Sequence, residues 1–288
     1  MQSILDLDHV IILVRDLGLA EAGMGRLGFR VTPRGTHSAE MGTANATAVF
    51  RDGTYVELMT VLSGTPLNRS LAAMLREREG LSAIALKTAD AHAAAAEFEA
   101  AGVGDGAADA LSRPVEIEGG TRDAAFTIAR IDPAKTPGAW VFVCQHHTPE
   151  VVWREGYLDH DNGVTGLAEV VGVAGDLNAV EDAYRPILGT GRTHRESERV
   201  RLDAGSAGIT FLAPLAFAAR FGQTPQDGGP HLAALSFRAT SLDRVKDLLR
   251  GHGIGSALSA AGDRILVPPT QECRVSIEFV ETRPVAVV

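Results

Sequence analysis

Residues 42–61, GTANATAVFRDGTYVELMTV, contain the pattern that decides the fold. Their alternation of residue types predicts two strands joined by a turn at residues 51–54. Successive side chains of a strand point to opposite sides, so Tyr55, Glu57 and Met59 share one face. Glu57 is therefore a carboxylate in an otherwise apolar strand. An unpaired charge there would cost several kcal/mol, so we expect either an arginine partner or a cation.

A strand followed by a helix recurs four times along the chain, with the same signals for the start and the end of the helix. Each apolar strand ends at a residue suited to N-capping, and each helix ends at a glycine. The spacing from cap to glycine is 12, 12, 13 and 12 residues for the pairs Asp16 and Gly28, Asp90 and Gly102, Asp176 and Gly189, and Ser241 and Gly253.

Up to three further strands follow each strand–helix pair. In the first unit they are predicted at residues 29–33, 44–51 and 55–62. In the second unit, the first strand after the helix is predicted at residues 115–118. The pattern predicts a βαβββ unit used four times, and hence an α+β fold.

Two connectors divide the chain. Residues 66–78 predict a helix between the first two units, and the charged, turn-rich residues 148–163 predict the boundary between halves. We therefore expect an N-terminal domain at residues 1–150 and a C-terminal domain at residues 163–288, each with two units. Residues 222–230 predict a surface loop, because they are rich in glycine and proline.

Composition excludes several classes of function. The formal net charge of −9 and the lack of a basic stripe argue against nucleic acid as a partner. No apolar run approaches the roughly 20 residues that cross a bilayer. The N-terminus lacks the features of a signal peptide, and Cys144 and Cys273 fit a reducing compartment, so we expect a cytoplasmic protein. No glycine-rich nucleotide motif or nucleophile elbow occurs, and Cys144 is interpreted as a core residue.

Several motifs carry a resemblance to a known superfamily. They are LDHVIILVRDL at residues 7–17, the GTAN beginning at Gly42, GTYVELM around Glu57, and HHTPEVVW at residues 146–153. With the fourfold βαβββ repeat, they resemble the vicinal oxygen chelate superfamily, and within it the glyoxalase-like proteins. The resemblance implies two paired glyoxalase/dioxygenase-like domains, in which two units surround a cleft. Residues of the first and fourth strands of such units hold a divalent metal, which leaves positions open for two neighbouring substrate oxygens.

Transferred to this chain, the resemblance implies His9 and Glu57 as metal ligands. The position equivalent to His9 in unit two is Ala83, so the ligand expected from that strand is missing. His146, at the end of the last strand of unit two, is the replacement candidate. His147 lies on the opposite face and is weaker. Asn45 and His37 are candidates to hold a substrate oxygen or complete the shell.

The bland interpretations stay open at this point. His9 can be a hydrogen-bonded core histidine, and Glu57 can neutralise it as an ion pair. Asn45 can stabilise a turn, and His146 can be a surface residue.

The second half carries a more degenerate version of the same positions. Glu169 corresponds to His9 and Glu278 to Glu57, whereas His231 lies out of register. A second site built from these three residues is conceivable. The stronger expectation is that the carboxylates pair with arginines such as Arg238 or Arg274.

The resemblance predicts a metal-dependent enzyme that acts on a small-molecule substrate with adjacent oxygens, by lyase, isomerase or dioxygenase chemistry. The ion would be Fe, Mn, Ni or Zn. Glu57 would double as a catalytic base, and Asn45 would orient the substrate. A homodimer stays open. The alternatives are a metal-free protein that binds or sequesters a small molecule, which Ala83 favours, and an interaction scaffold that works through its second half.

Overall fold

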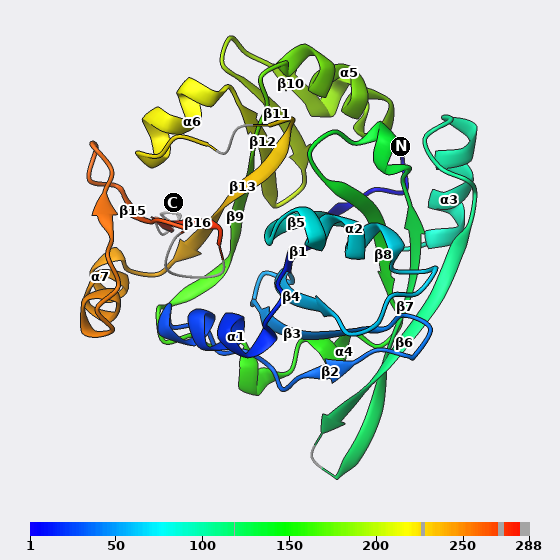
Figure 1. Cartoon of the computed structure of the whole chain (residues 1–288), viewed down its shortest axis with the longest axis horizontal. Helices are drawn as coiled ribbons and strands as arrows, with labels where there is room; N and C mark the ends of the chain where they lie inside the picture. Colours follow the sequence, from blue (N-terminus) through cyan, green and yellow to red (C-terminus); the bar gives the residue numbers. More distant parts are fainter. Residues whose placement is uncertain (118, 226–227, 270–273, 283–288) are drawn as a thin grey trace, which may run out of the picture.

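Two eight-stranded sheets dominate the computed structural model, which describes residues 1–117, 119–225, 228–269 and 274–282 (Figure 1). The strand order is β2-β3-β4-β1-β5-β8-β7-β6 in the first sheet and β10-β11-β12-β9-β13-β16-β15-β14 in the second. The two orders correspond strand for strand. The structure therefore confirms an α+β fold of four βαβββ units, paired two by two.

The first sheet and its helices occupy the N-terminal half. Its strands are β1 (Asp6–Leu13), β2 (Gly35–Thr36), β3 (Thr43–Val49), β4 (Tyr55–Val61), β5 (Gly80–Lys87), β6 (Ala108–Ile117), β7 (Gly120–Arg130) and β8 (Trp140–His146). The α-helices are α1 (Leu17–Arg26), α2 (Arg69–Glu77), α3 (Ala91–Ala100) and α4 (Pro149–Val152), with short 3-10 helices η1 (Pro133–Lys135) and η2 (Glu155–Tyr157).

The second sheet repeats this plan. Its strands are β9 (Val164–Val173), β10 (Thr193–Arg195), β11 (Arg199–Ala204), β12 (Ala207–Leu212), β13 (His231–Ala239), β14 (Ala257–Leu258), β15 (Arg264–Val267) and β16 (Ser276–Glu281). The helices are α5 (Leu177–Leu188), α6 (Pro214–Phe221) and α7 (Leu242–Gly251), with the 3-10 helix η3 (Thr190–Arg192).

The predicted N-caps and terminal glycines of the four helices are confirmed. In all four units the cap side chain accepts a hydrogen bond from a backbone N–H of the first helical turn, as Asp16 does from Leu19. The glycines that follow the helices have positive φ values, which β-carbon-bearing residues rarely adopt. These values are +85° at Gly28, +67° at Gly102, +91° at Gly189 and +66° at Gly253.

The strand predicted at residues 29–33 is wrong. Phe29 is buried, and its ring lies 4.9 Å from that of Phe237 in the second half. Pro33 has no N–H to give to a strand ladder. This segment therefore packs between the halves, and the strand that follows is only Gly35–Thr36.

The two halves share one hydrophobic core. It lies between the backs of the two sheets and the helices, and it includes Val10 and Ile84 from the first sheet and Leu235 and Phe279 from the second. Each concave face has smaller clusters of its own. β6 packs against β2, so the first sheet curls into a nearly closed barrel, whereas the corresponding β14 has only two residues.

The connectors agree with the sequence in part. The helix predicted within residues 66–78 is confirmed as α2. Residues 148–163 hold α4 and η2 and link the sheets. Residues 226–227 of the predicted loop, and Cys273, lie outside the described residues. No described helix combines the length and the apolar character that crossing a membrane requires.

Candidate functional site

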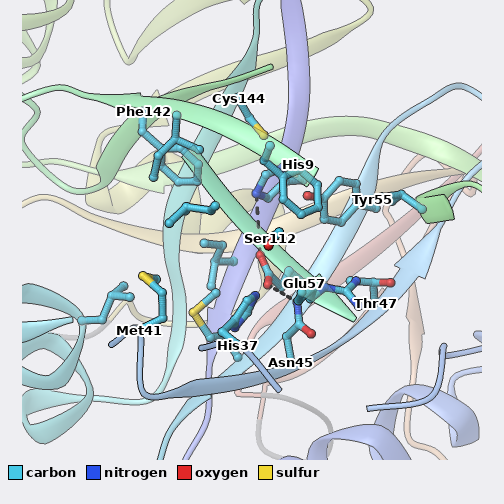
Figure 2. Close-up of a pocket in the computed structure, with 18 of the residues that line it drawn as sticks. His9, His37, Met41, Asn45, Thr47, Tyr55, Glu57, Ser112, Phe142 and Cys144 are labelled. Atoms are coloured by element: carbon cyan, nitrogen blue, oxygen red, sulfur yellow. Dashed lines mark hydrogen bonds and ion pairs between the residues drawn. The ribbon is translucent and has the colours of Figure 1, made fainter. Parts of the chain in front are cut away.

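The candidate site is a cavity of about 70 Å³ on the concave face of the first sheet (Figure 2). β1 pairs in parallel with β4, and the register sets His9 opposite Tyr55 and Ile11 opposite Glu57. His9, Tyr55 and Glu57 all line the cavity, and the shared face of Tyr55 and Glu57 is the one that the strand periodicity predicted. His37, Asn45 and Cys144 line it as well.

Asp8 is a buried residue that fixes the orientation of His9. Its Oδ1 lies 2.6 Å from His9 Nδ1 and 2.9 Å from His146 Nε2. Burial alone would raise the pKa of the Asp8 carboxyl. The hydrogen bonds from His146 and His9 outweigh burial and hold that pKa well below its usual range. An ionised carboxylate only accepts, so both ring nitrogens donate to it.

A β-bulge explains how two consecutive residues reach the same face. Leu7 pairs with Leu86 and His9 with Ala85, so Asp8 is an extra residue on β1. A bulge interrupts the alternation of faces and redirects a side chain. Strict alternation predicts Asp8 and His9 on opposite faces, which is why sequence reasoning missed Asp8. The available signal was an acidic residue next to the histidine in an apolar strand.

Glu57 is held from one side by Asn45. Asn45 Nδ2 on β3 donates to Glu57 Oε1 at 2.5 Å, and Glu57 Oε2 lies 3.7 Å from His9 Nε2. Both carboxylate contacts are drawn in Figure 2. Among the described residues, no arginine or lysine lies within ion-pair distance of Glu57. The interpretation of Glu57 as a core charge paired with arginine is therefore not what the structure shows.

The facing atoms of His9 and Glu57 fit a shared cation. With Nδ1 donating to Asp8, a neutral His9 ring presents its Nε2 lone pair to the Glu57 carboxylate. Their 3.7 Å separation is longer than a hydrogen bond. Two metal bonds of about 2.1 Å, the usual length to histidine nitrogen or carboxylate oxygen, span up to about 4.2 Å. A divalent ion between the two atoms would satisfy both.

The second unit adds no ligand to this pair. Ala83 pairs with Trp140, and Phe142 follows two residues later, just as Glu57 follows Tyr55. Ala83 and Phe142 thus occupy the positions equivalent to His9 and Glu57. The Phe142 ring packs edge-on against His9 with centroids 5.6 Å apart. Among the described residues at these four equivalent positions, His9 and Glu57 are thus the two that could contact an ion.

His146 lies behind His9 and does not line the cavity. Its Nε2 donates to Asp8, its Nδ1 is buried without a hydrogen-bond partner, and its ring contacts Trp153 at 4.7 Å. Asp8, Cys144 and His146 form a group whose potential ligand atoms lie within 4.8 Å of one another. Within the described part of the chain, this is the one group of three or more His, Cys, Asp or Glu residues that lie close enough together to hold a metal ion. The role of His146 as a ligand beside His9 and Glu57 stays a prediction.

Cys144 and His147 make other contacts. Burial raises the pKa of the Cys144 thiol well above its usual value, so this cysteine stays protonated and is a poor ligand or nucleophile. His147 Nε2 lies 2.8 Å from Thr127 Oγ1, on the far side of β8. His37 lines the cavity, its Nδ1 lies 2.9 Å from Thr43 Oγ1, and burial lowers its pKa.

Arg113 on β6 is a cavity residue that sequence reasoning missed. It is 7% exposed and lines the cavity beside Asn45 and Glu57. The strand predicted at residues 115–118 begins too late, because β6 extends from Ala108 to Ile117. The alternation Leu111, Arg113, Val115 could have placed Arg113 on the concave face had the strand been extended.

The corresponding face of the second sheet is filled by an arginine. Arg220 of α6 lies 2.6 Å from Glu169 Oε2 and 2.6 Å from Glu278 Oε2. Arg264 reaches Glu278 at 3.4 Å, and Thr210 donates to Glu169 at 2.5 Å. Burial alone would raise the pKa of Glu278, but the hydrogen bond from Arg220 lowers it.

The expectation of carboxylates paired to arginines in this half is thus met by different arginines. Arg238 pairs with Asp52 and Arg274 with Glu79, because each points away from this face. His231 contacts the Gly229 carbonyl at 3.0 Å instead of the carboxylates. The conceivable site of Glu169, Glu278 and His231 is therefore not assembled.

Comparisons with known structures support the fold. A hypothetical protein from Staphylococcus aureus matches with a TM-score of 0.66 at 11% identity, over 96% of this chain and 99% of that one. The Mn(II)-bound glyoxalase from Novosphingobium aromaticivorans matches at 0.55 and 14%, over 97% and 82%. A mutant 4-hydroxymandelate synthase from Streptomyces coelicolor matches at 0.59 and 13%, over 97% and 93%.

Comparisons of sequence place the chain in a family. No curated protein sequence matches. The model of the glyoxalase-like domain matches residues 7–188, which is more than half of the chain and includes all of the first sheet except Asp6. This match identifies the chain as a member of the glyoxalase-like domain family, and the solved structures above share its fold.

Proposed function

We propose that this protein is a divalent-metal-dependent enzyme that acts on a small molecule with two adjacent oxygens. The observation that carries the proposal is that His9 Nε2 and Glu57 Oε2 face each other 3.7 Å apart in a buried cavity. Fe, Mn, Ni and Zn are all compatible with one nitrogen and one carboxylate ligand. When bound, the ion would polarise the substrate oxygens as a Lewis acid.

Other side chains would orient the two ligands and contact the substrate, and Glu57 itself would accept a proton. Asp8 holds the His9 ring so that Nε2 faces Glu57, in the manner of the carboxylates that commonly orient metal-binding histidines. Asn45 fixes Glu57 Oε1 through its amide group. The Asn45 Oδ1 atom is buried without a partner, so it is available to accept a hydrogen bond from a substrate hydroxyl. Glu57 is the candidate base, because its carboxylate lines the same cavity.

Two protein ligands imply a weak site that the substrate completes. Catalytic zinc sites usually have three protein ligands, so this pair should bind a metal less tightly than those sites do. The same count leaves more coordination positions for substrate oxygens. Lyase, isomerase and dioxygenase chemistry are all compatible with this arrangement.

A metal analysis tests the proposal. Protein purified without chelator, and protein titrated with Fe(II), Mn(II), Ni(II) or Zn(II), should bind about one ion per chain. His9→Ala and Glu57→Gln should each reduce the affinity at least 100-fold. His92→Ala and Glu99→Gln, on the exposed surface of α3, are the matched controls and should bind as the wild type does. A wild type that binds none of these ions refutes the proposal.

A metal-free binding protein is the second candidate, and Ala83 and Phe142 favour it. They put apolar groups at both positions where unit two would supply ligands. The cavity lining is largely hydrocarbon and aromatic, which suits capture of a small ligand. This candidate predicts that ligands raise the melting temperature equally with and without EDTA, and that no metal co-purifies.

A further inference from the structure

Arg113 is a buried charge with no hydrogen-bond or ion-pair partner among the described residues, and the Glu57 carboxylate acts on it only at longer range. It is 7% exposed, and no side-chain hydrogen bond or ion pair to it occurs within the described residues. The less buried arginines near the domain boundary are satisfied: Arg244 donates to the Asp161 carbonyl and Arg30 to the Gly156 carbonyl. Buried charges are normally paired because desolvating a lone ion is costly. The guanidinium therefore has donors to spare, inside the cavity that contains Glu57 and His9.

The space around the guanidinium is shaped to hold it. A β-carbon at Gly35 on β2 would lie 2.7 Å from Arg113 Nη1 and 2.9 Å from Asn45 Oδ1. Glycine at this position leaves room for the Arg113 head group beside the Asn45 carbonyl. The missing side chain at Gly35 lets β2 lie close to β6 at this point. Arg113 and Asn45 thus present donors and an acceptor at the same wall of the cavity.

We propose that Arg113 is the anchor for a carboxylate, and that the natural ligand is a small carboxylic acid anion with a mainly hydrocarbon body. The inference rests on the proposed function only in assigning substrate to this cavity. A guanidinium offers two parallel N–H groups, which match the two oxygens of a planar carboxylate. Among the described residues that line the cavity, Arg113 is the one arginine or lysine, which suits a monoanion better than a doubly charged phosphate.

The rest of the cavity fits the body of such a ligand. Arg113 lies opposite Ala124 of β7, two residues before Phe126, which pairs with His146 at the end of β8, whereas Trp140 begins β8 at its other end. Between them the walls are apolar, formed by Ile11, Met59, Leu71, Leu111, Ile128 and Phe142. A ligand whose carboxylate rests on Arg113 would pass His9 and Glu57 with its adjacent carbon atoms and direct its hydrocarbon end toward Trp140.

Binding of simple probes to metal-free protein tests this anchor. In EDTA, benzoate, hexanoate and 2-oxobutanoate are titrated by calorimetry against wild type, Arg113→Met and Arg113→Lys. The neutral benzamide and inorganic phosphate serve as comparisons. At least one of the carboxylates should bind the wild type. Its affinity for Arg113→Met should be at least tenfold lower. Its affinity for Arg113→Lys should be intermediate, because lysine keeps the positive charge but lacks the two parallel N–H groups of the guanidinium. Benzamide should not bind.

The controls separate this anchor from folding and from the metal site. Arg122→Met, on the neighbouring strand β7 and paired with the exposed Glu150, should bind the probes as the wild type does. Circular dichroism should show that Arg113→Met is folded. Equal carboxylate binding by Arg113→Met and wild type, no binding of any carboxylate, or a preference for phosphate would each overturn the proposal. Mn(II) titration of Arg113→Met should match the wild type. Absence of Mn(II) binding alongside Arg113-dependent benzoate binding would refute the proposed function and leave the anchor standing.

Discussion

The concave faces of the two sheets occupy the same place in the same fold, yet they treat buried charge in opposite ways. In the second sheet, the carboxylates of Glu169 and Glu278 both pair with Arg220. In the first sheet, Glu57 faces a histidine and Arg113 has no partner among the described residues. Paired charges support a fold, whereas unpaired groups around a cavity are available to a ligand.

The difference in charge pairing comes from the helix that follows β4 in the first sheet and the helix that follows β12 in the second. α2 follows β4 and presents the apolar residues Leu71 and Leu75 to the first face. α6 follows β12 and presents Arg220 to the second face. One guanidinium thus takes the place that a cation would occupy between carboxylates. The carboxylates of Glu169 and Glu278 on the second face are thus paired with arginine, whereas Glu57 and Arg113 on the first face are open to a ligand.

The largest expected effect separates the two arginines. Arg220→Met should destabilise the fold by about 3–5 kcal/mol, because it leaves the buried Glu278 carboxylate with the more distant Arg264 as its cationic partner. Arg113→Met should leave stability unchanged or increase it, because it removes an unpaired buried charge. Urea unfolding measures both. Arg250→Met, an exposed pair with Asp247, is the control and should change stability by less than about 0.5 kcal/mol. Equal losses at both buried arginines would contradict the comparison.

The two histidine–aspartate contacts give the next contrast. Asp8→Asn should reduce Mn(II) affinity by about 10- to 100-fold, because the His9 ring loses the carboxylate that orients it. His194 and Asp203 form a similar contact at 2.9 Å on the surface of the second half. Asp203→Asn should leave Mn(II) affinity unchanged. Calorimetric titration of both variants is the measurement, and unaltered affinity in Asp8→Asn would remove Asp8 from the account.

Acid should weaken the second face through Glu278. The pKa of Glu278 is lowered in the folded protein from its ordinary value of 4.5. Its carboxylate therefore adds stability that is complete above about pH 4.5 and is lost as the pH falls through the lower folded-state pKa. Glu278→Gln should cost stability at pH 6, and its difference from wild type should shrink at pH 3.5. A difference that is constant between the two pH values would contradict the Arg220 pairing.

The smallest expected effect is steric. Gly35→Ala should weaken benzoate binding a few-fold, because the new methyl group would lie only 2.7 Å from Arg113 Nη1 and so forces the head group to shift. Gly25→Ala, where the new methyl group meets nothing within 4 Å inside α1, should leave binding unchanged and raise stability by about 0.5–1 kcal/mol. Benzoate titration of both variants checks the prediction. Stronger binding by Gly35→Ala would argue against Arg113 as the anchor.

The repeat and the concave position of Glu57 could be predicted because local signals encode them. Caps such as Asp16, glycines such as Gly28 and the strand period are all readable from short stretches of sequence. The parts of the site that escaped prediction depend on departures from regularity or on distant contacts. Asp8 reaches the His9 face through a bulge, and Arg113 lies on a strand that begins earlier than its sequence suggests.

Pairing across the chain was the least predictable feature. Arg238 and Arg274 are closer in sequence to Glu278 than Arg220 is, but they point elsewhere. The partner comes from α6, 58 residues away from Glu278 in sequence. Only the fold brings that helix over the concave face, so no local pattern identifies it.

The location of a bound Mn(II) ion tests the central claim most directly. Crystals of the protein soaked in Mn(II) and measured for anomalous scattering should give one peak, between His9 Nε2 and Glu57 Oε2, and no peak beside Arg220. A peak within the Asp8, Cys144 and His146 group, or no peak at full soaking, would contradict the assignment of His9 and Glu57 as the metal-binding pair.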